Sequence, residues 1–434
     1  MELKTTPENK PTIKKSNSGA KLFYYILIGL VLGVVVGQCV HLYVSESAVA
    51  SFSANIKVLG DMFIRLIQMI IAPLIFCTIT VGICKMGDMK MVGRVGGKAL
   101  IWFITASLIS LTIGLVWVNI TDPGFSTEID MSTAVQASDL VQNSSNINFV
   151  EFVKHLIPRS VFEAMATNEI LQILVFSIMF SLALVTFGKR AEPIINALDT
   201  IAHTVLKMVN YIMVVAPIAV FGTIAAAVAS HGLGIFKVYA NFFLAFLLGI
   251  LTLWAFLMAV GWFVLGGKKL KQLLLAIRSP LLIAFSTTSS EAVFPKLVEE
   301  LEKIGCSPKV VSFILPLGYS FNLDGSMMYM TFASIFIAQL YGIDLSVSTQ
   351  ITMLLVLMIT SKGIAGVPRA SLVVIIASCA MFGIPPEGVA LLIPIDHFCD
   401  MARSMTNALG NALATTVVDK WENKGGAPKQ AEVA

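Results

Sequence analysis

Charged side chains are scarce in this sequence. Asp, Glu, Lys and Arg make up 13% of its 434 residues, about half of the roughly 25% that soluble domains carry. Hydrophobic residues account for 56%, and the mean hydropathy is +0.84. The formal net charge of +4 is too small to indicate a nucleic-acid-binding surface. This composition excludes an ordinary soluble domain and indicates an all-α polytopic membrane protein.

Residues for redox, metal and hydrolytic chemistry are also few. The six cysteines form no CxxC pair and fall mostly in apolar segments, which is typical of small buried side chains and not of disulfides or zinc ligands. No GxSxG or HExxH string occurs, and none of the five histidines lies near Ser289 and Ser290. We therefore predict that the protein is not an enzyme and holds no cofactor.

Six apolar stretches approach or exceed the roughly 20 residues that a bilayer-spanning helix needs. They cover residues 22–44, 62–83, 100–120, 170–187, 208–227 (preceded by a helix from Pro193) and 238–265. Residues 1–21 are polar, contain five lysines and have no small-residue cleavage site close behind them. This pattern predicts a retained first helix and no signal peptide.

The loop charges predict the orientation. Lysine and arginine cluster before residue 22, at 85–98, at 189–190, at 268–271 and from residue 420 onward, whereas loops 45–54, 121–148 and 230–234 hold almost none. Positively charged loops stay in the cytoplasm. We therefore place both termini in the cytoplasm.

Two segments after residue 265 are predicted to be re-entrant helical hairpins. In the first, residues 270–304, an apolar piece leads into STTSSE, and a charged segment with three lysines follows at 296–309. That segment stays in the cytoplasm only if the chain turns back at STTSSE. The second, residues 346–382, has TSKGIAGVP at its tip and flanks without Lys or Arg, so it enters from outside. Together they suggest an inverted repeat.

The apolar segment at 310–342 is interrupted by GYSFNLDGS, which brings Gly318, Asn322, Asp324 and Gly325 together. Non-helical backbone at membrane depth is tolerated only where it lines a cavity or is buried in protein. Unwound carbonyls beside an aspartate suit a hard cation. The alternative is a glycine kink relieved by packing, with Asp324 satisfied by neighbouring polar side chains.

The last apolar helix, residues 395–420, carries one polar stripe. With about 100° of rotation per residue, Asp396, Asp400, Arg403, Asn407 and Asn411 share a face. Each charge at the bilayer centre costs roughly 2.5–3.5 kcal/mol on insertion scales. The stripe must therefore face protein, water or a ligand. One alternative is an internal salt bridge that only locks helices together, but five polar groups in register favour a binding site.

Four strings in this order carry a resemblance to a known family: STTSSEAVFPK, PLGYSFNLDGS, SKGIAGVP and DHFCDMARSMTNALGN. The chain resembles the dicarboxylate/amino acid:cation symporter family over about residues 21–421, and is most similar to the bacterial proton/glutamate-aspartate symporters. The resemblance implies about eight transmembrane helices, two re-entrant hairpins and a glutamate-transporter-like elevator fold. It also implies a homotrimer in a plasma membrane, here a bacterial inner membrane.

The resemblance divides the chain into parts. Residues 1–21 and 423–434 would be cytoplasmic tails, 22–84 scaffold helices 1 and 2, and 85–121 a transport-domain helix. Residues 122–232 would form an extracellular loop and scaffold helices 4 and 5, and 233–422 the transport-domain core. The transport domain would slide against the scaffold, with the hairpin tips as gates.

The resemblance also assigns substrate-binding residues. Arg403 would pair with a side-chain carboxylate, since a guanidinium offers bidentate geometry, and Asp400 would take the substrate ammonium. Asn407, with Ser289 and Ser290, would bind the α-carboxylate, and Ser326 stands where relatives have Thr near the side-chain carboxylate. The full implied set is Ser289, Ser290, Ser326, Gly366, Asp400, Arg403, Ser404 and Asn407.

The cation site implied by the resemblance comprises Gly318, Asn322, Asp324, Ser361, Asn407 and Asn411. Asn411 stands where well-known sodium-coupled members carry Asp, so one sodium site loses its formal charge. Met330 stands where excitatory transporters carry a proton-binding Glu. Glu291 is a candidate proton carrier, and the alternative is a carboxylate that caps the second arm of the hairpin. We expect coupling to protons, with sodium left open.

The expected function is secondary active symport of glutamate or aspartate with protons or sodium. Neutral amino acid relatives lack the arginine and C4-dicarboxylate relatives lack an aspartate at position 400, so the presence of both Asp400 and Arg403 favours acidic amino acids. A C4-dicarboxylate symporter is the alternative. A channel would need a continuous polar path, and an intramembrane hydrolase would need a base beside Ser289 or Ser290.

Overall fold

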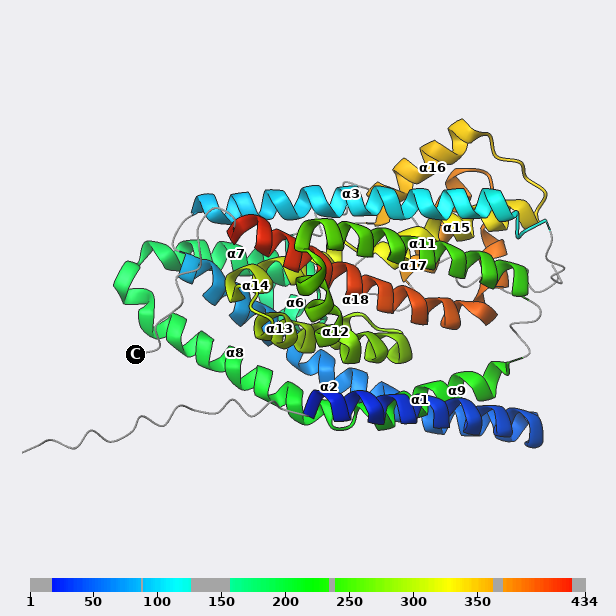
Figure 1. The fold of residues 1–434 in the computed structure, drawn as a ribbon, viewed down its shortest axis with the longest axis horizontal. Helices are drawn as coiled ribbons and strands as arrows, with labels where there is room; N and C mark the ends of the chain where they lie inside the picture. Colours follow the sequence, from blue (N-terminus) through cyan, green and yellow to red (C-terminus); the bar gives the residue numbers. More distant parts are fainter. Residues whose placement is uncertain (1–17, 87–88, 126–156, 234–238, 362–369, 424–434) are drawn as a thin grey trace, which may run out of the picture.

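The computed structural model describes residues 18–86, 89–125, 157–233, 239–361 and 370–423 (Figure 1). All regular elements in these ranges are helices. Five of them are long and apolar enough to cross a membrane, and the count reaches six if one bent pair is a single span. The predicted number of eight transmembrane helices therefore stays a prediction.

One group of helices surrounds α9 (Ala216–His231). The helices α1 (Ser18–Tyr43) and α2 (Glu46–Met86) both pack against it. A β-carbon on Gly29 of α1 would lie 2.5 Å from the Pro217 carbonyl oxygen, and one on Gly33 would lie 2.9 Å from that of Phe221. Small residues let helix backbones approach closely in membranes, where water does not drive association. The glycines of α1 thus set its distance from α9.

The predicted span at 208–227 is not one straight helix. The helices α8 (Glu192–Met213) and α9 meet at Val214 and Val215 with a bend of 54°. Pro217 lies in the first turn of α9, where its missing amide hydrogen costs nothing, whereas inside a continuous helix it would remove a hydrogen bond and clash with the preceding turn. The same group contains α6 (Val161–Ala166), α7 (Ile170–Thr186) and the short η2 (Gly188–Ala191).

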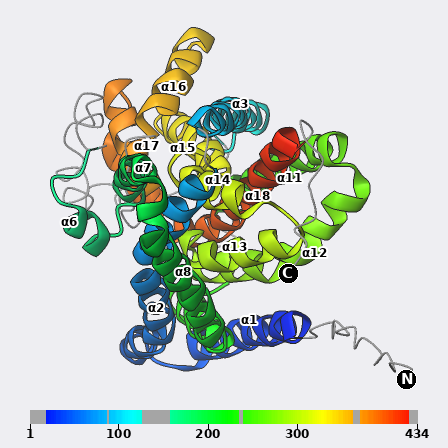
Figure 2. The same ribbon diagram turned by 90° about the vertical axis from the view of Figure 1, so that its left-hand side faces the viewer.

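A second group surrounds α18 (Ile393–Asn423), which lies in the middle of the molecule (Figures 1 and 2). It packs against α3 (Met89–Thr121), α11 (Ala240–Leu265), α12 (Gly267–Thr287), α14 (Pro308–Phe321) and α15 (Asp324–Leu340). In both views α1 and α3 lie on opposite sides of α18. Nearly all of α18 from Met401 to Asp419 is buried, which explains how a helix with five polar residues in register is accommodated.

Breaks between helices occur at two of the segments that the sequence predicted to be irregular. The re-entrant hairpins stay predictions, because α12 (Gly267–Thr287) is itself long and apolar enough to cross a membrane. The helix α12 ends at Thr287. The next residue, Thr288, has a φ of 51° and turns the chain toward η3 (Glu291–Val293) and α13 (Phe294–Lys303), both of which pack on α12. Asn322 and Leu323 separate α14 from α15. The helices α16 (Val347–Thr360) and α17 (Ala370–Met381) also pack on each other and are followed by η5 (Pro386–Leu392). The connecting residues 362–369 lie outside the described residues.

Candidate substrate-binding and cation sites

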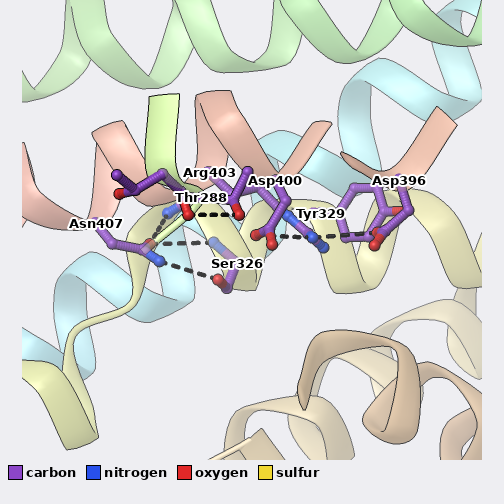
Figure 3. A network of polar contacts seen from close by, with 9 residues as sticks. Thr288, Ser326, Tyr329, Asp396, Asp400, Arg403 and Asn407 are labelled. Atoms are coloured by element: carbon purple, nitrogen blue, oxygen red, sulfur yellow. Dashed lines mark hydrogen bonds and ion pairs between the residues drawn. The ribbon is translucent and has the colours of Figure 1, made fainter. Parts of the chain in front are cut away.

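Arg403 lies at the centre of a buried ion network on α18 (Figure 3). Its Nη2 is 3.1 Å from an Asp396 carboxylate oxygen and 2.9 Å from one of Asp400. Its guanidinium carbon lies 4.0 Å from the ring centroid of Tyr329 on α15, and the Tyr329 hydroxyl donates to Asp396 at 3.0 Å. The network fixes the guanidinium in one orientation.

The Arg403 guanidinium keeps donors that the described residues do not satisfy. The Arg403 side chain is 1% exposed, yet its Nε and Nη1 have no hydrogen-bond partner within the described ranges. A buried donor without a partner costs about 1–3 kcal/mol, and more for a charged group. A carboxylate ligand would remove that cost, because it accepts two parallel hydrogen bonds from a guanidinium.

The two carboxylates in this network differ in exposure. The Asp396 side chain is 2% exposed and the Asp400 side chain 27% exposed. Asp396 receives hydrogen bonds from both Arg403 and Tyr329, so it serves as a fixed counter-charge. Asp400 presents a carboxylate to the space beside Arg403. The arrangement can hold a ligand that carries an anion and a cation close together.

Asn407 connects α18 to the start of α15. Its Oδ1 accepts from the backbone amides of Gly325 at 2.9 Å and Ser326 at 3.2 Å, and its Nδ2 donates to the Ser326 hydroxyl at 3.0 Å. These amides lie in the first turn of a helix, where intrahelical partners are missing. Asn407 and Ser326, both predicted site residues, are thus brought together one turn beyond Arg403.

The turn after α12 lies beside the ion network. Figure 3 shows Thr288 next to Asp400 and Arg403. The Ser289 hydroxyl accepts from the Ala292 amide at 3.2 Å, so in this structure it caps the turn, while Ser290 is half-buried. The predicted serines therefore lie in a segment that reaches the site, and Ser289 already has a structural partner.

The break between α14 and α15 contains a cluster of oxygen atoms. The Asn322 Nδ2 donates to an Asp324 carboxylate oxygen at 3.1 Å. The Asn411 side-chain amide, with its nitrogen turned toward this break, donates to the carbonyl oxygens of Asn322 at 3.1 Å and of Gly318 at 3.3 Å. The hydroxyl of Ser110 on α3 donates to Asp324 at 3.4 Å. Asn322, Asp324 and Asn411 are all buried.

This cluster fits the donor chemistry of a hard cation. Carbonyl, carboxamide and carboxylate oxygens are the ligands that such ions take. The side-chain oxygen of Asn322 is buried without a hydrogen-bond partner in the described residues. The described residues contain no group of three His, Cys, Asp or Glu side chains able to hold a metal ion, so a cation here would rely on backbone and amide oxygens together with the single carboxylate of Asp324.

The other predicted site residues are placed less directly. Ser404 is buried one residue after Arg403. Ser361 is buried at the end of α16, and its hydroxyl donates to the Met358 carbonyl oxygen at 3.2 Å. Glu291 begins η3, directly after the turn. Gly366 lies outside the described residues.

A family model described as the sodium:dicarboxylate symporter family matches residues 22–421. That match spans almost the whole chain. The chain belongs to this family. Its members are transporters, so the several apolar helices are those of a multi-pass membrane protein that carries a small molecule together with a cation.

The curated relatives of this symporter have two kinds of name. A "Proton/sodium-glutamate symport protein" of Bacillus caldotenax is 38% identical over 420 residues, covering 93% of this chain and 95% of the relative. A "C4-dicarboxylate transport protein" of Bacillus subtilis (strain 168) is 39% identical over 416 residues, covering 95% and 97%. A "Proton/sodium-glutamate symport protein" of that strain is 36% identical over 410 residues, covering 92% of each. Overall similarity therefore does not decide between the two substrates.

The sequence does not single out Tyr329 or Thr288 for the site. It places Asp396 on the polar stripe without indicating a role in binding. A tyrosine hydroxyl in an apolar helix needs a partner, which is the only sequence feature that points to Tyr329. Nothing in the sequence distinguishes Thr288 from the hydroxyl residues beside it, because its left-handed backbone conformation appears only in the structure.

Proposed function

We propose that this symporter imports aspartate and glutamate. The observation that carries the proposal is the arrangement around Arg403: two buried guanidinium donors that no described residue satisfies, and the partly exposed Asp400 carboxylate one helical turn away. The guanidinium binds the side-chain carboxylate of the substrate. Asp400 binds its ammonium.

The charge balance supports a substrate with an ammonium group. One guanidinium and two carboxylates leave a formal net charge of −1 in the network. A C4-dicarboxylate would add two negative charges beside Asp400, whereas aspartate brings an ammonium to offset it. Like charges in a site of low dielectric disfavour each other strongly. C4-dicarboxylate transport remains the second candidate, and the names of the relatives favour it as much as the first.

The remaining residues of the proposed binding site come from α18, from the start of α15 and from the two predicted hairpin tips. Asn407, Ser289 and Ser290 bind the α-carboxylate, Ser326 lies near the side-chain carboxylate, and Ser404 and Gly366 complete the site. The Ser289 oxygen accepts from the Ala292 amide, which leaves its hydroxyl hydrogen to donate to the α-carboxylate.

Coupling is assigned to protons or sodium. Oxygen atoms of Gly318, Asn322, Asp324 and Asn411, together with those of Ser361 and Asn407, form the cation site when sodium is used. Glu291 carries the proton when protons are used.

Transport proceeds by an elevator motion in a homotrimer with cytoplasmic termini in a bacterial inner membrane. The helices around α9 form the scaffold, over residues 22–84 and 122–232. Residues 85–121 and 233–422 form the transport domain, with two re-entrant hairpins as gates. The grouping of helices around α9 and α18 supports this division.

Uptake into proteoliposomes tests the proposed function. Labelled aspartate and labelled succinate are supplied in parallel, with a proton gradient or a sodium gradient imposed separately. We expect saturable accumulation of aspartate against its gradient, driven by at least one of the two cations, and weaker uptake of succinate. Succinate as the better substrate would establish the second candidate, and flux without saturation or accumulation would indicate a channel.

A further inference from the structure

The first arm of the second hairpin, α16, is hydrogen-bonded to α3 at its base. The Asn119 Nδ2 donates to the Gln350 Oε1 at 2.7 Å, and the Gln350 Nε2 donates to the Asn119 Oδ1 at 3.1 Å. The same Gln350 nitrogen also donates to the Leu345 carbonyl oxygen at 2.9 Å. Gln350 is buried, so its amide is fully satisfied by this one set of partners.

A second glutamine, Gln339 of α15, holds the end of α3 to which α16 is bonded. From α15, the Gln339 Nε2 donates to the Val118 carbonyl oxygen at 3.1 Å and to Asp122 at 3.0 Å, and its Oε1 accepts from the Gly124 amide at 3.0 Å. The C-terminal end of α3 is therefore held to α15. Asn119 lies between these contacts and offers α16 an immobile attachment point.

Beyond Gln350, the buried side chains on α16 are mostly apolar. Met353, Leu354 and Leu357 are buried, whereas Ile351, Leu355 and Ile359 are about half exposed. In Figure 1 the N-terminal end of α16 projects from the body of the molecule, and its C-terminal end lies closer to the body. Apolar packing is not directional and permits sliding, whereas the amide pair breaks only at the cost of unpaired polar groups. From Gln350 to Thr360 the helix rises by about 15 Å.

We propose that the Asn119–Gln350 amide pair is the pivot about which α16 swings when the second hairpin opens. Hinges of moving elements lie at a few positions near element ends, and Gln350 is the fourth residue of α16. The pair positions the gate without touching the substrate. This inference rests on the proposed function, in which the second hairpin is a gate.

Spin-label distances in the full-length protein test the pivot. One label replaces exposed Ile101 on α3, and the second replaces either Val347 at the base of α16 or Ile359 near its tip, in a Cys39→Ser background. Addition of aspartate is expected to change the distance to the tip and to leave the distance to the base unchanged. Equal changes at base and tip would mean that α16 moves as a rigid unit, which overturns the pivot.

Substitutions in the Asn119–Gln350 amide pair provide a second test of the pivot. Gln350→Leu and Asn119→Leu are expected to broaden the tip distance distribution and to weaken aspartate binding by roughly 3- to 20-fold, the range for interhelical hydrogen bonds in membranes. The exchanged pair, Asn119→Gln with Gln350→Asn, is expected to recover part of the loss. Thr352→Val is the matched control, since its hydroxyl donates only within α16, to the Ser348 carbonyl oxygen.

The inference and the proposed function fail differently. If the wild type does not bind aspartate, the proposed substrate is wrong, and the pivot is still tested by the tip distribution without substrate. If Gln350→Leu has the same tip distribution as Thr352→Val, the pivot is wrong even though uptake continues. Gel-filtration profiles of the variants exclude misfolding as the cause of a broad distribution.

Discussion

Arg403 is the residue on which the proposed substrate binding depends. A charge in the interior of a membrane protein is costly unless it is paired, and Asp396, Asp400 and the Tyr329 ring supply the pairing. Only one of its terminal nitrogens has a described partner. The guanidinium is therefore paired through one nitrogen and keeps two donors that the described residues leave unsatisfied.

Replacement of Arg403 by Cys is expected to move the preference from acidic toward neutral amino acids. Truncating one partner of a buried, hydrogen-bonded charge pair costs about 2–5 kcal/mol, so aspartate affinity falls by on the order of 30-fold or more. Competition of neutral amino acids with labelled aspartate measures the shift. Unchanged aspartate transport would contradict the role of the guanidinium.

Replacement of Asp400 by Ser is expected to weaken aspartate uptake far more than succinate uptake. A hydrogen bond to a charged group contributes about 1.5–3 kcal/mol, which corresponds to roughly 10- to 150-fold in affinity for the ammonium-bearing substrate. Parallel concentration series for the two substrates give the ratio. An equal loss for both would show that Asp400 does not bind the ammonium.

Replacement of Glu291 by Gln tests its role as a proton carrier. The variant is expected to lose uptake driven by a proton gradient while it retains exchange of external for internal aspartate, since exchange requires no net proton movement. Glu300→Gln, on the outer part of α13 where Glu300 pairs with Lys296 and Lys303, is the control. Loss of exchange together with uptake would indicate that Glu291 only supports the turn.

At the scale of elements, the contact between α15 and α18 depends on the absence of a side chain. A β-carbon on Gly325 would lie 2.6 Å from the Arg403 carbonyl oxygen and 2.9 Å from its Cα. Both are backbone atoms, which move only if the helix moves. Gly325 therefore lets α15 begin directly against α18, the helix that carries the ion network. The same close approach allows the Gly325 amide to donate to Asn407.

Replacement of Gly325 by Ala is expected to destabilise the protein by roughly 1–3 kcal/mol, the usual cost of overpacking, and to reduce aspartate affinity as well, because α15 and α18 separate. Thermal unfolding in detergent measures the first effect. Gly97→Ala is the matched control, since a β-carbon there meets nothing within 4 Å and alanine favours a helix. Equal melting temperatures for the two variants would contradict the close approach of α15 to α18 at Gly325.

At the scale of the whole molecule, the two groups of helices meet along a limited set of contacts. The helix α12 packs against α1 and α9, and α14 packs against α2 and α7. At one of these contacts the Arg278 guanidinium lies 5.0 Å from the Phe23 ring centroid. If the transport domain slides past the scaffold, this contact must break.

A cross-link between α1 and α12 is therefore expected to abolish uptake. Cysteines at positions 23 and 278, in a Cys39→Ser background, are joined by a short bifunctional thiol reagent, and uptake of labelled aspartate is measured before and after. Cysteines at positions 38 and 233, where the Leu233 amide donates to Gln38 within the group around α9, form the control, whose cross-link is expected to leave uptake intact. Full uptake with α1 and α12 joined would exclude an elevator motion.

The sequence by itself determined the class of the molecule and the helix that carries its buried polar groups. Its scarcity of charge predicted a membrane protein, and the polar stripe of α18 predicted which residues lie inside, because unpaired charge cannot face lipid. The broken span was predicted at GYSFNLDGS, since glycine, asparagine and aspartate there oppose a continuous helix.

Only the tertiary structure decided which polar groups are partners. It placed Tyr329 over Arg403, assigned Asp396 as the fixed counter-charge, turned Asn407 to the start of α15 and used Ser289 as a cap. It also broke the predicted helix at 208–227 and joined Asn119 to Gln350. Helical periodicity specifies the face on which a side chain lies, but its partners come from helices distant in the sequence, and their positions follow from packing.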